Sequence, residues 1–188
     1  MTTTAPASGL EGVVASSTAI SSIEDGALRY RGYRIEDLAR HAGFEEVVAL
    51  LWDGELPNAQ QIQTIRGELA AAYRLPELTE RFLRRIPPTG DGSDPMAFLL
   101  AAIALMAIGE PEADDRSSEA SRRKAIRLTA AMHTAVGAMS QALYSRQPVP
   151  ADPSLSIAAD LLCMVRGEPA PPEAVRALDV ALVLHADH

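Results

Sequence analysis

The chain has 188 residues, 47% of them hydrophobic, with a formal net charge of −8 and a sequence pI near 5. This length suits one compact domain or a large piece of one, with enough chain to bury a substantial core. The acidic balance and the scattered Lys and Arg residues argue against a nucleic-acid-binding surface. The single cysteine, Cys163, excludes an internal disulfide bond.

The sequence predicts neither a secretory signal nor a membrane span. Residues 1–8 are polar and small, without a basic start or an apolar run. The longest apolar run, residues 96–108, is shorter than the ~20 residues that a spanning helix needs. We therefore expect a cytoplasmic protein with no membrane partner.

The N-terminal part predicts a short β-hairpin at about residues 18–31. Two β-compatible runs, residues 18–23 and 27–30, flank Asp25-Gly26. Glycine can adopt the positive φ that a tight turn requires, so this dipeptide is a good hairpin signal.

From about residue 35 to 188 the apolar spacing is that of helices. Asn58 and Ser117 or Ser118 are suitable N-cap residues, and Gly167 is a suitable stop signal. In chain order we expect helices over about residues 35–43, 44–52, 59–73, 76–85, 96–108, 117–145, 156–166 and 172–185.

Two of these helices have distinctive apolar patterns. Residues 96–108 are apolar on every side, which predicts burial all round and favours a partner subunit covering part of the helix. In the longest helix an apolar stripe with steps of three and four fits a core helix and an interface helix equally well. The stripe contains Ala125, Leu128, Met132, Val136, Met139 and Leu143.

The sequence printed ends with His185-Ala186-Asp187-His188, at the end of the last predicted helix. Histidine is favoured there as a cation and can donate from both ring nitrogens, which suits binding of a dicarboxylic keto acid. A frayed polar terminus is the alternative. A metal site needs three or four converging ligands, and His41 and His133 lie on other predicted helices, so none is expected.

Several segments resemble the citrate synthase family, and the terminal motif is the most specific of them. The 2-methylcitrate synthases share these features. The matching segments are Glu11–Val14, Thr18–Ser21, Leu28–Tyr33, Ile35–Ala39, Phe44–Val47, Leu51–Trp52, Gly54–Pro57, Pro95–Met96, Ala125–Leu128 and Ala177–His188.

The resemblance implies an all-α fold with a short N-terminal β-hairpin. Residues 1–188 would be the N-terminal part of the large domain, and the small domain and the C-terminal part would be absent. The resemblance also implies a homodimer whose active site lies in the cleft between the large and small domains. In the tricarboxylic acid cycle such enzymes condense oxaloacetate with the methyl carbon of acetyl-CoA, a co-substrate, through an enol or enolate and without a cofactor.

By match to the motif, His188 would bind oxaloacetate and His185 would be its close neighbour. The family's catalytic aspartate, general-acid histidine and carboxylate-binding arginines come later, so we expect no catalytic residue within this chain and no activity from it alone. The middle of the chain departs from the pattern, because Asp94 precedes Pro95-Met96 where the family commonly has histidine.

Three interpretations follow. The first is an N-terminal piece of a citrate synthase: a truncated gene, a partial sequence, or one chain of a split enzyme whose second chain carries the C-terminal part. The second is a non-enzymatic remnant that acts only as a helix-packing or dimerisation module. The third is a fragment of a 2-methylcitrate synthase that uses propionyl-CoA.

Overall fold

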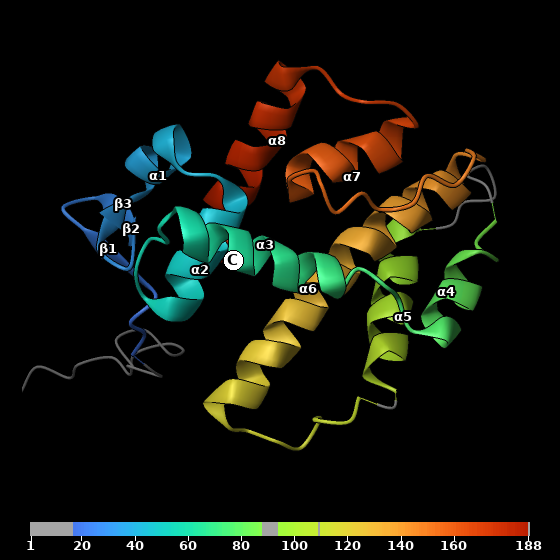
Figure 1. The fold of residues 1–188 in the computed structure, drawn as a ribbon, viewed down its shortest axis with the longest axis horizontal. Helices are drawn as coiled ribbons and strands as arrows, with labels where there is room; N and C mark the ends of the chain where they lie inside the picture. The colour runs from blue at the N-terminus through green and yellow to red at the C-terminus, as the bar shows by residue number, and fades with distance from the viewer. Residues whose placement is uncertain (1–16, 88–93, 109, 188) are drawn as a thin grey trace, which may run out of the picture.

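The structure, a computed structural model, describes residues 17–87, 94–108 and 110–187. In these ranges three short strands are followed by eight helices. The long helix α6 (Ser118–Leu143) runs through the middle, with the strands toward one end of the molecule and α4 and α5 toward the other (Figure 1). The prediction of an all-α fold with a short N-terminal β element is confirmed. The matching segment Glu11–Val14 lies outside the described residues.

The strands form a three-stranded antiparallel sheet in the order β1-β2-β3. β1 (Ser21–Glu24) and β2 (Ala27–Tyr30) are the predicted hairpin, and their turn places Asp25 at φ 50° and Gly26 at φ 74°. β3 (Tyr33–Arg34) was not predicted, because two residues are too few to show an alternating pattern.

The first four helices lie close to their predicted ranges: α1 Ile35–His41, α2 Phe44–Asp53, α3 Ala59–Ala71 and α4 Glu77–Leu83. Asn58 is the N-cap of α3, as predicted, and its side chain accepts hydrogen bonds from the backbone N–H groups of Gln60 and Gln61. Gly54 ends α2 at φ 91°, a conformation that favours glycine.

The remaining helices are α5 (Pro95–Ala107), α6, α7 (Ile157–Arg166) and α8 (Pro172–Leu184). Asp94, Ser117 and Ser156 each accept a backbone hydrogen bond at a helix start. Within the described residues, no helix is long and apolar enough to cross a membrane.

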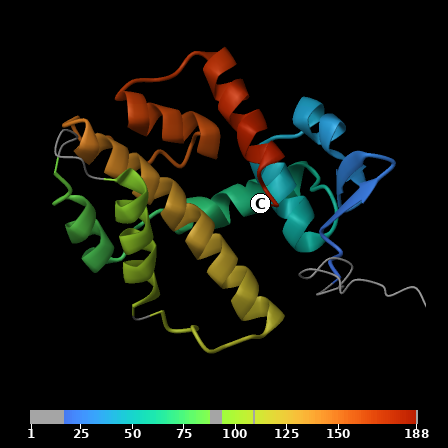
Figure 2. The same cartoon turned by 180° about the vertical axis from the view of Figure 1, so that it is seen from behind.

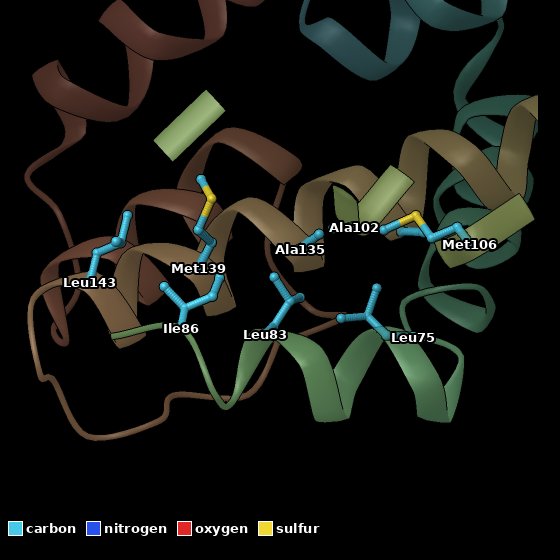
Figure 3. Close-up of a cluster of buried hydrophobic side chains, with 9 residues drawn as sticks. Leu75, Leu83, Ile86, Ala102, Met106, Ala135, Met139 and Leu143 are labelled. Atoms are coloured by element: carbon cyan, nitrogen blue, oxygen red, sulfur yellow. The ribbon is translucent and has the colours of Figure 1, made fainter. Parts of the chain in front are cut away.

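One hydrophobic core lies where α4 and α5 pack against the C-terminal half of α6 (Figure 3). Ala102 and Met106 are its buried residues from α5, and Ala135 and Met139 are two of those from α6. α6 also contacts α3 and α7, so it is enclosed from several directions. Small side chains allow this close approach, as at Gly137, where a Cβ atom would lie 2.5 Å from the Met164 methyl carbon.

Two predictions from the apolar patterns were wrong in part. Helix α5 buries only Ala102 and Met106, and its Met96, Leu100 and Ile108 side chains are more than 60% exposed. On α6 the predicted stripe includes Leu128, which is half-exposed. Neighbouring helices surround the C-terminal part of α6 and leave its N-terminal part more open, so burial there does not follow a single stripe.

A second core joins the two ends of the described chain. Tyr30 of β2, Leu38 of α1, Leu50 of α2 and Val183 of α8 belong to one buried cluster. Figure 2 shows α8 descending onto this N-terminal part of the fold. The cluster therefore fixes the C-terminal end of α8 against the sheet and the first two helices.

Candidate functional site

The C-terminal end of α8 carries the predicted motif, and all of its last four carbonyl groups have a partner. Such carbonyls lack partners inside an α-helix and must find them elsewhere. The backbone N–H groups of His185 and Ala186 donate to the carbonyls of Leu182 and Val183. The remaining two, on Ala181 and Leu184, accept from side chains, as described below.

The His185 ring is exposed and held by its own helix. Its Nδ1 atom lies 2.8 Å from the carbonyl oxygen of Ala181. A carbonyl only accepts hydrogen bonds, so Nδ1 carries a proton in this contact and Nε2 is the nitrogen available to a ligand. Asp187 is half-buried two residues further on. His188, the predicted oxaloacetate ligand, lies outside the described residues.

Arg176 fastens α8 to the end of α1. Its guanidinium donates to the carbonyl oxygens of Ala39, Arg40 and Ala42, at 2.5, 2.9 and 3.2 Å. These carbonyls belong to the last turn of α1 and its C-cap, so one side chain of α8 caps the end of a helix that is distant in sequence.

Asp179 fastens α8 to the start of α2. Its carboxylate accepts a hydrogen bond from the backbone N–H of Phe44 at 2.9 Å, and it lies 3.0 Å from Arg176. A carboxylate at a helix N-terminus also interacts favourably with the helix dipole. Arg176 and Asp179 thus place α8 on two other helices at once.

Away from this end, a buried polar cluster joins α6 and α7. His133 of α6 and Asp160 of α7 are 5% and 0% exposed, and Nε2 lies 3.1 Å from Oδ2. The contact is within ion-pair distance but lacks the geometry of a hydrogen bond. The Tyr73 ring packs on the His133 ring, with centroids 4.7 Å apart. Because the cluster is enclosed, it supports the fold and offers no surface to a substrate.

Burial and neighbouring carboxylates keep the hydroxyl of Tyr73 protonated. Burial, with a smaller contribution from the carboxylates of Asp160 and Glu45, raises the pKa of Tyr73 to about 12. Glu45 is itself buried and accepts a hydrogen bond from the backbone N–H of Ile157, the first residue of α7, at 3.0 Å. Glu45 therefore ties α2 to α7.

A polar hollow of about 330 Å³ lies between α2, α3 and the start of α6. Arg122 lines it, and this guanidinium is already paired with Asp53 at 3.3 Å and with Glu68 at 3.2 Å. No residue of α8 or of the turn after it lines this hollow. Among the described residues, no group of three or more His, Cys, Asp and Glu side chains could hold a metal ion.

Comparison with known proteins identifies the family to which this arrangement corresponds. The family model described as citrate synthase, C-terminal domain, matches residues 9–188. The chain belongs to the citrate synthase family. The match covers both the sheet and the terminal motif, the two regions that the buried cluster around Tyr30 and Val183 brings together.

Relatives and solved structures of the citrate synthase family cover nearly the whole chain. Citrate synthase 2 of Bacillus subtilis is 40% identical over 181 residues, 96% of this chain and 48% of the relative. A 2-methylcitrate synthase of Mycobacterium tuberculosis is 32% identical over 182 residues, 96% of this chain and 45% of the relative. The chain therefore spans about half the length of these relatives.

The fold also matches a solved citrate synthase with its ligands. A ternary complex of carboxymethyl coenzyme A and oxaloacetate with the citrate synthase of Thermoplasma acidophilum superposes with a TM-score of 0.86 at 28% identity. The match covers 95% of this chain and 47% of that one. This likeness confirms the fold expected for a citrate synthase.

Sequence reasoning placed His185 correctly at the end of α8, but it missed the residues that hold this end in place. Arg176 and Asp179 look like ordinary surface charges in a helix, and their partners are backbone groups more than 130 residues away. Tyr30, whose hydroxyl reaches Leu184, was visible only as part of a family motif. The oxaloacetate role of His185 and His188 stays a prediction.

Proposed function

We propose that the chain forms part of the active site of a citrate synthase, which condenses oxaloacetate with acetyl-CoA to give citrate and CoA. The observation that carries this proposal is the family match from residue 9 to residue 188, which ends on the histidine motif. His188 and His185 bind oxaloacetate in this proposal. The cytoplasm and the tricarboxylic acid cycle are the setting that such an activity suggests.

The chemistry of His185 fits a role in binding an anion. With Nδ1–H directed at Ala181, the neutral ring presents an acceptor at Nε2, whereas the cation presents a second N–H donor. The cation is the form that can donate to a carboxylate or keto oxygen of oxaloacetate. A hydrogen bond between charged groups is stronger than a neutral one, so the cation is also the tighter binder.

Condensation requires more than oxaloacetate binding. A base must remove a proton from the methyl group of acetyl-CoA, and donors must stabilise the enolate oxygen that develops. The proposal uses both motif histidines for oxaloacetate and assigns no catalytic residue to this chain. The base and the enolate donors would come from a segment beyond residue 188 or from a second chain.

A 2-methylcitrate synthase is the second candidate. The Mycobacterium tuberculosis relative of that name matches the same share of this chain as the Bacillus subtilis citrate synthase, at a lower identity. The two activities differ in the acyl-CoA, so the relative rates with acetyl-CoA and propionyl-CoA in a complete enzyme would separate them.

The exposed face of α5 supports assembly with a second copy of the chain. Met96, Leu100 and Ile103 recur at helical spacing on this face, beside the face that carries the buried Ala102 and Met106. An apolar strip without charged side chains is typical of an interface between subunits. A homodimer is therefore part of the proposed function. It would also be the whole function if the chain were a non-enzymatic dimerisation module.

A thiol-release assay with oxaloacetate and acetyl-CoA tests the division of roles. The purified 188-residue chain is expected to give no signal above background, and a citrate synthase of the relatives' length serves as the positive control. Turnover in proportion to the amount of the 188-residue chain would show that the base and the enolate donors are present in it, against the proposal.

A further inference from the structure

Tyr30 of β2 connects the N-terminal sheet to the turn that carries His185. Its side chain is fully buried, and its hydroxyl donates a hydrogen bond to the carbonyl oxygen of Leu184 at 3.2 Å, although 154 positions separate the two residues. The backbone of Asp187 lies near enough to this hydroxyl to lower its pKa. One phenol is therefore hydrogen-bonded to the start of the turn from Leu184 to Asp187 and lies near its end.

This contact differs from the others at the end of α8. The carbonyls of Ala181, Leu182 and Val183 accept from groups of the motif itself. Leu184 is the last residue of α8, and its carbonyl accepts from a different part of the fold. Residues 185–187 form a turn in which His185 and Ala186 still bond to α8, and Tyr30 adds a bond from the N-terminal sheet.

The sheet that carries Tyr30 is itself held firmly. The guanidinium of the neighbouring Arg31 donates to the carbonyl oxygen of Leu51 on α2 at 2.8 Å. Around the Tyr30 ring, Leu38, Leu50 and Val183 belong to the same buried cluster. A buried aromatic ring has few accessible rotamers, so the position of its hydroxyl is well defined.

The hydroxyl of Tyr30 stays protonated at neutral pH. Burial raises the pKa of Tyr30, and the nearby backbone of Asp187 partly opposes this effect by lowering the pKa. The negative charge of Asp187 raises the pKa as well. A protonated phenol can donate to the carbonyl oxygen of Leu184.

We propose that Tyr30 is a positioning residue for the oxaloacetate site, acting through the backbone of Leu184 to fix the turn that presents His185. This role rests on the proposed function for its substrate, but the contact itself does not. Tyr30 does not touch the substrate. The N-terminal sheet, far from the motif in sequence, becomes part of the site by this contact.

The first test measures the turn itself. Tyr30→Phe removes only the hydroxyl, and Tyr33→Phe, an exposed tyrosine paired with Tyr30 across the sheet, is the matched control. In NMR spectra of the full 188-residue chain, amide hydrogen exchange at Ala186 and Asp187 should rise about three- to tenfold in Tyr30→Phe, the loss expected for one hydrogen bond. The His185 ring signals should shift as well.

A positioning role predicts that these changes are confined to the turn. Exchange at Val47 and Leu50, which are buried in α2, should stay as in the wild-type chain. Unchanged exchange at both Ala186 and Asp187 would overturn the proposal. A uniform rise across α2 and α8, in proportion to a loss of global stability, would also overturn it, because Tyr30 would then be an ordinary core residue.

The second test adds oxaloacetate and follows the His185 ring signals. The half-saturating concentration should rise about three- to tenfold in Tyr30→Phe and stay unchanged in Tyr33→Phe. A wild-type response that Tyr30→Phe leaves unaltered would overturn the positioning role alone. If His185 in the wild-type chain did not respond to oxaloacetate, the proposed function of this histidine would fail, and the positioning role toward oxaloacetate with it.

Discussion

Helices α5 and α6 lie side by side and show opposite relations between composition and burial. α5 contains no charged residue, yet its Met96, Leu100 and Ile103 side chains are exposed. α6 carries several Arg and Lys residues near its start, yet its C-terminal half buries His133 and Gln141 among small apolar residues. The difference shows that position within the fold decides burial in this chain, and composition alone does not.

The contrast has a physical explanation. α6 has α3, α4, α5 and α7 as neighbours, so residues on several of its sides are enclosed, polar ones such as His133 and Gln141 included. α5 lies at one side of the molecule, packs on α4 and α6, and leaves one face open. This open apolar face is the basis of the homodimer proposed above.

The largest effect on stability should come from the buried His133–Asp160 pair between α6 and α7. His133→Ala removes one partner of a buried pair and leaves the Asp160 carboxylate without it, at a cost of about 3–5 kcal/mol in the free energy of unfolding. His41→Ala, at an exposed histidine in the last turn of α1, is the control and should change stability by less than about 0.5 kcal/mol. Chemical denaturation measures both. If both variants lost equally little free energy of unfolding, the core around α6 would tolerate the Asp160 carboxylate without His133.

A smaller effect should come from the closest approach of α6 to α7. In Gly137→Ala the new methyl group would meet Met164, and the strain should cost about 1–3 kcal/mol despite the better helix propensity of alanine. Gly67→Ala on the exposed face of α3 meets no atom within 4 Å and should stabilise by up to ~1 kcal/mol. Thermal unfolding of both variants measures whether each substitution lowers or raises the stability. A stable Gly137→Ala would show that Met164 can move aside.

The open face of α5 should affect association and leave stability nearly unchanged. Leu100→Lys places a charge on a side chain that is 70% exposed, so the free energy of unfolding of the monomer should change by less than about 0.5 kcal/mol. Self-association should be lost, because the charge would have to be desolvated in the interface. Leu78→Lys, at an exposed leucine of α4, is the matched control. Light scattering after size-exclusion chromatography that finds a wild-type monomer would contradict the interface.

The smallest effect concerns the segment that joins α5 to α6. Hydrogen bonds from Arg123 and Arg127 lower the pKa of Glu112 from its ordinary 4.5 to about 2. Because the pKa is lower in the folded chain, the stabilisation is present above pH 4.5 and disappears as the pH falls toward about 2. Glu112→Gln should flatten the decline of stability across this window, while the exposed Glu55→Gln should not. If stability fell with pH to the same extent in the wild-type chain, Glu112→Gln and Glu55→Gln, the hydrogen bonds of Glu112 with Arg123 and Arg127 would not be the cause.

Much of the fold could be predicted from local signals. Asp25-Gly26, Asn58 and Gly167 mark a turn, a helix start and a helix end, because each depends only on neighbouring residues. Long-range contacts could not be predicted in this way. Nothing in the spacing of Arg176 or Tyr30 indicates that their partners lie at the other end of the chain.

The sequence predicted the terminal motif but not the contacts that hold it in position. The match to the family motif identified His185, and its position at a helix end favours a histidine there. The direction of its ring depends on the Ala181 carbonyl one turn earlier in the same helix, whereas the contact of the turn with Tyr30 is a tertiary one. For α5 the pattern predicted burial on every side, in part by a partner subunit, but it could not say which of its residues face away from the chain's own core.

The central claim, that the terminal motif binds oxaloacetate, is tested most directly by His188→Ala in a protein that joins this chain to a segment completing the relatives' length. Loss of a hydrogen bond to a charged group, worth about 1.5–3 kcal/mol, should raise the half-saturating oxaloacetate concentration about ten- to a hundredfold. The half-saturating acetyl-CoA concentration should stay within about twofold, and His41→Ala should change neither. If acetyl-CoA saturation moved and oxaloacetate saturation did not, the assignment of the motif to oxaloacetate would be contradicted.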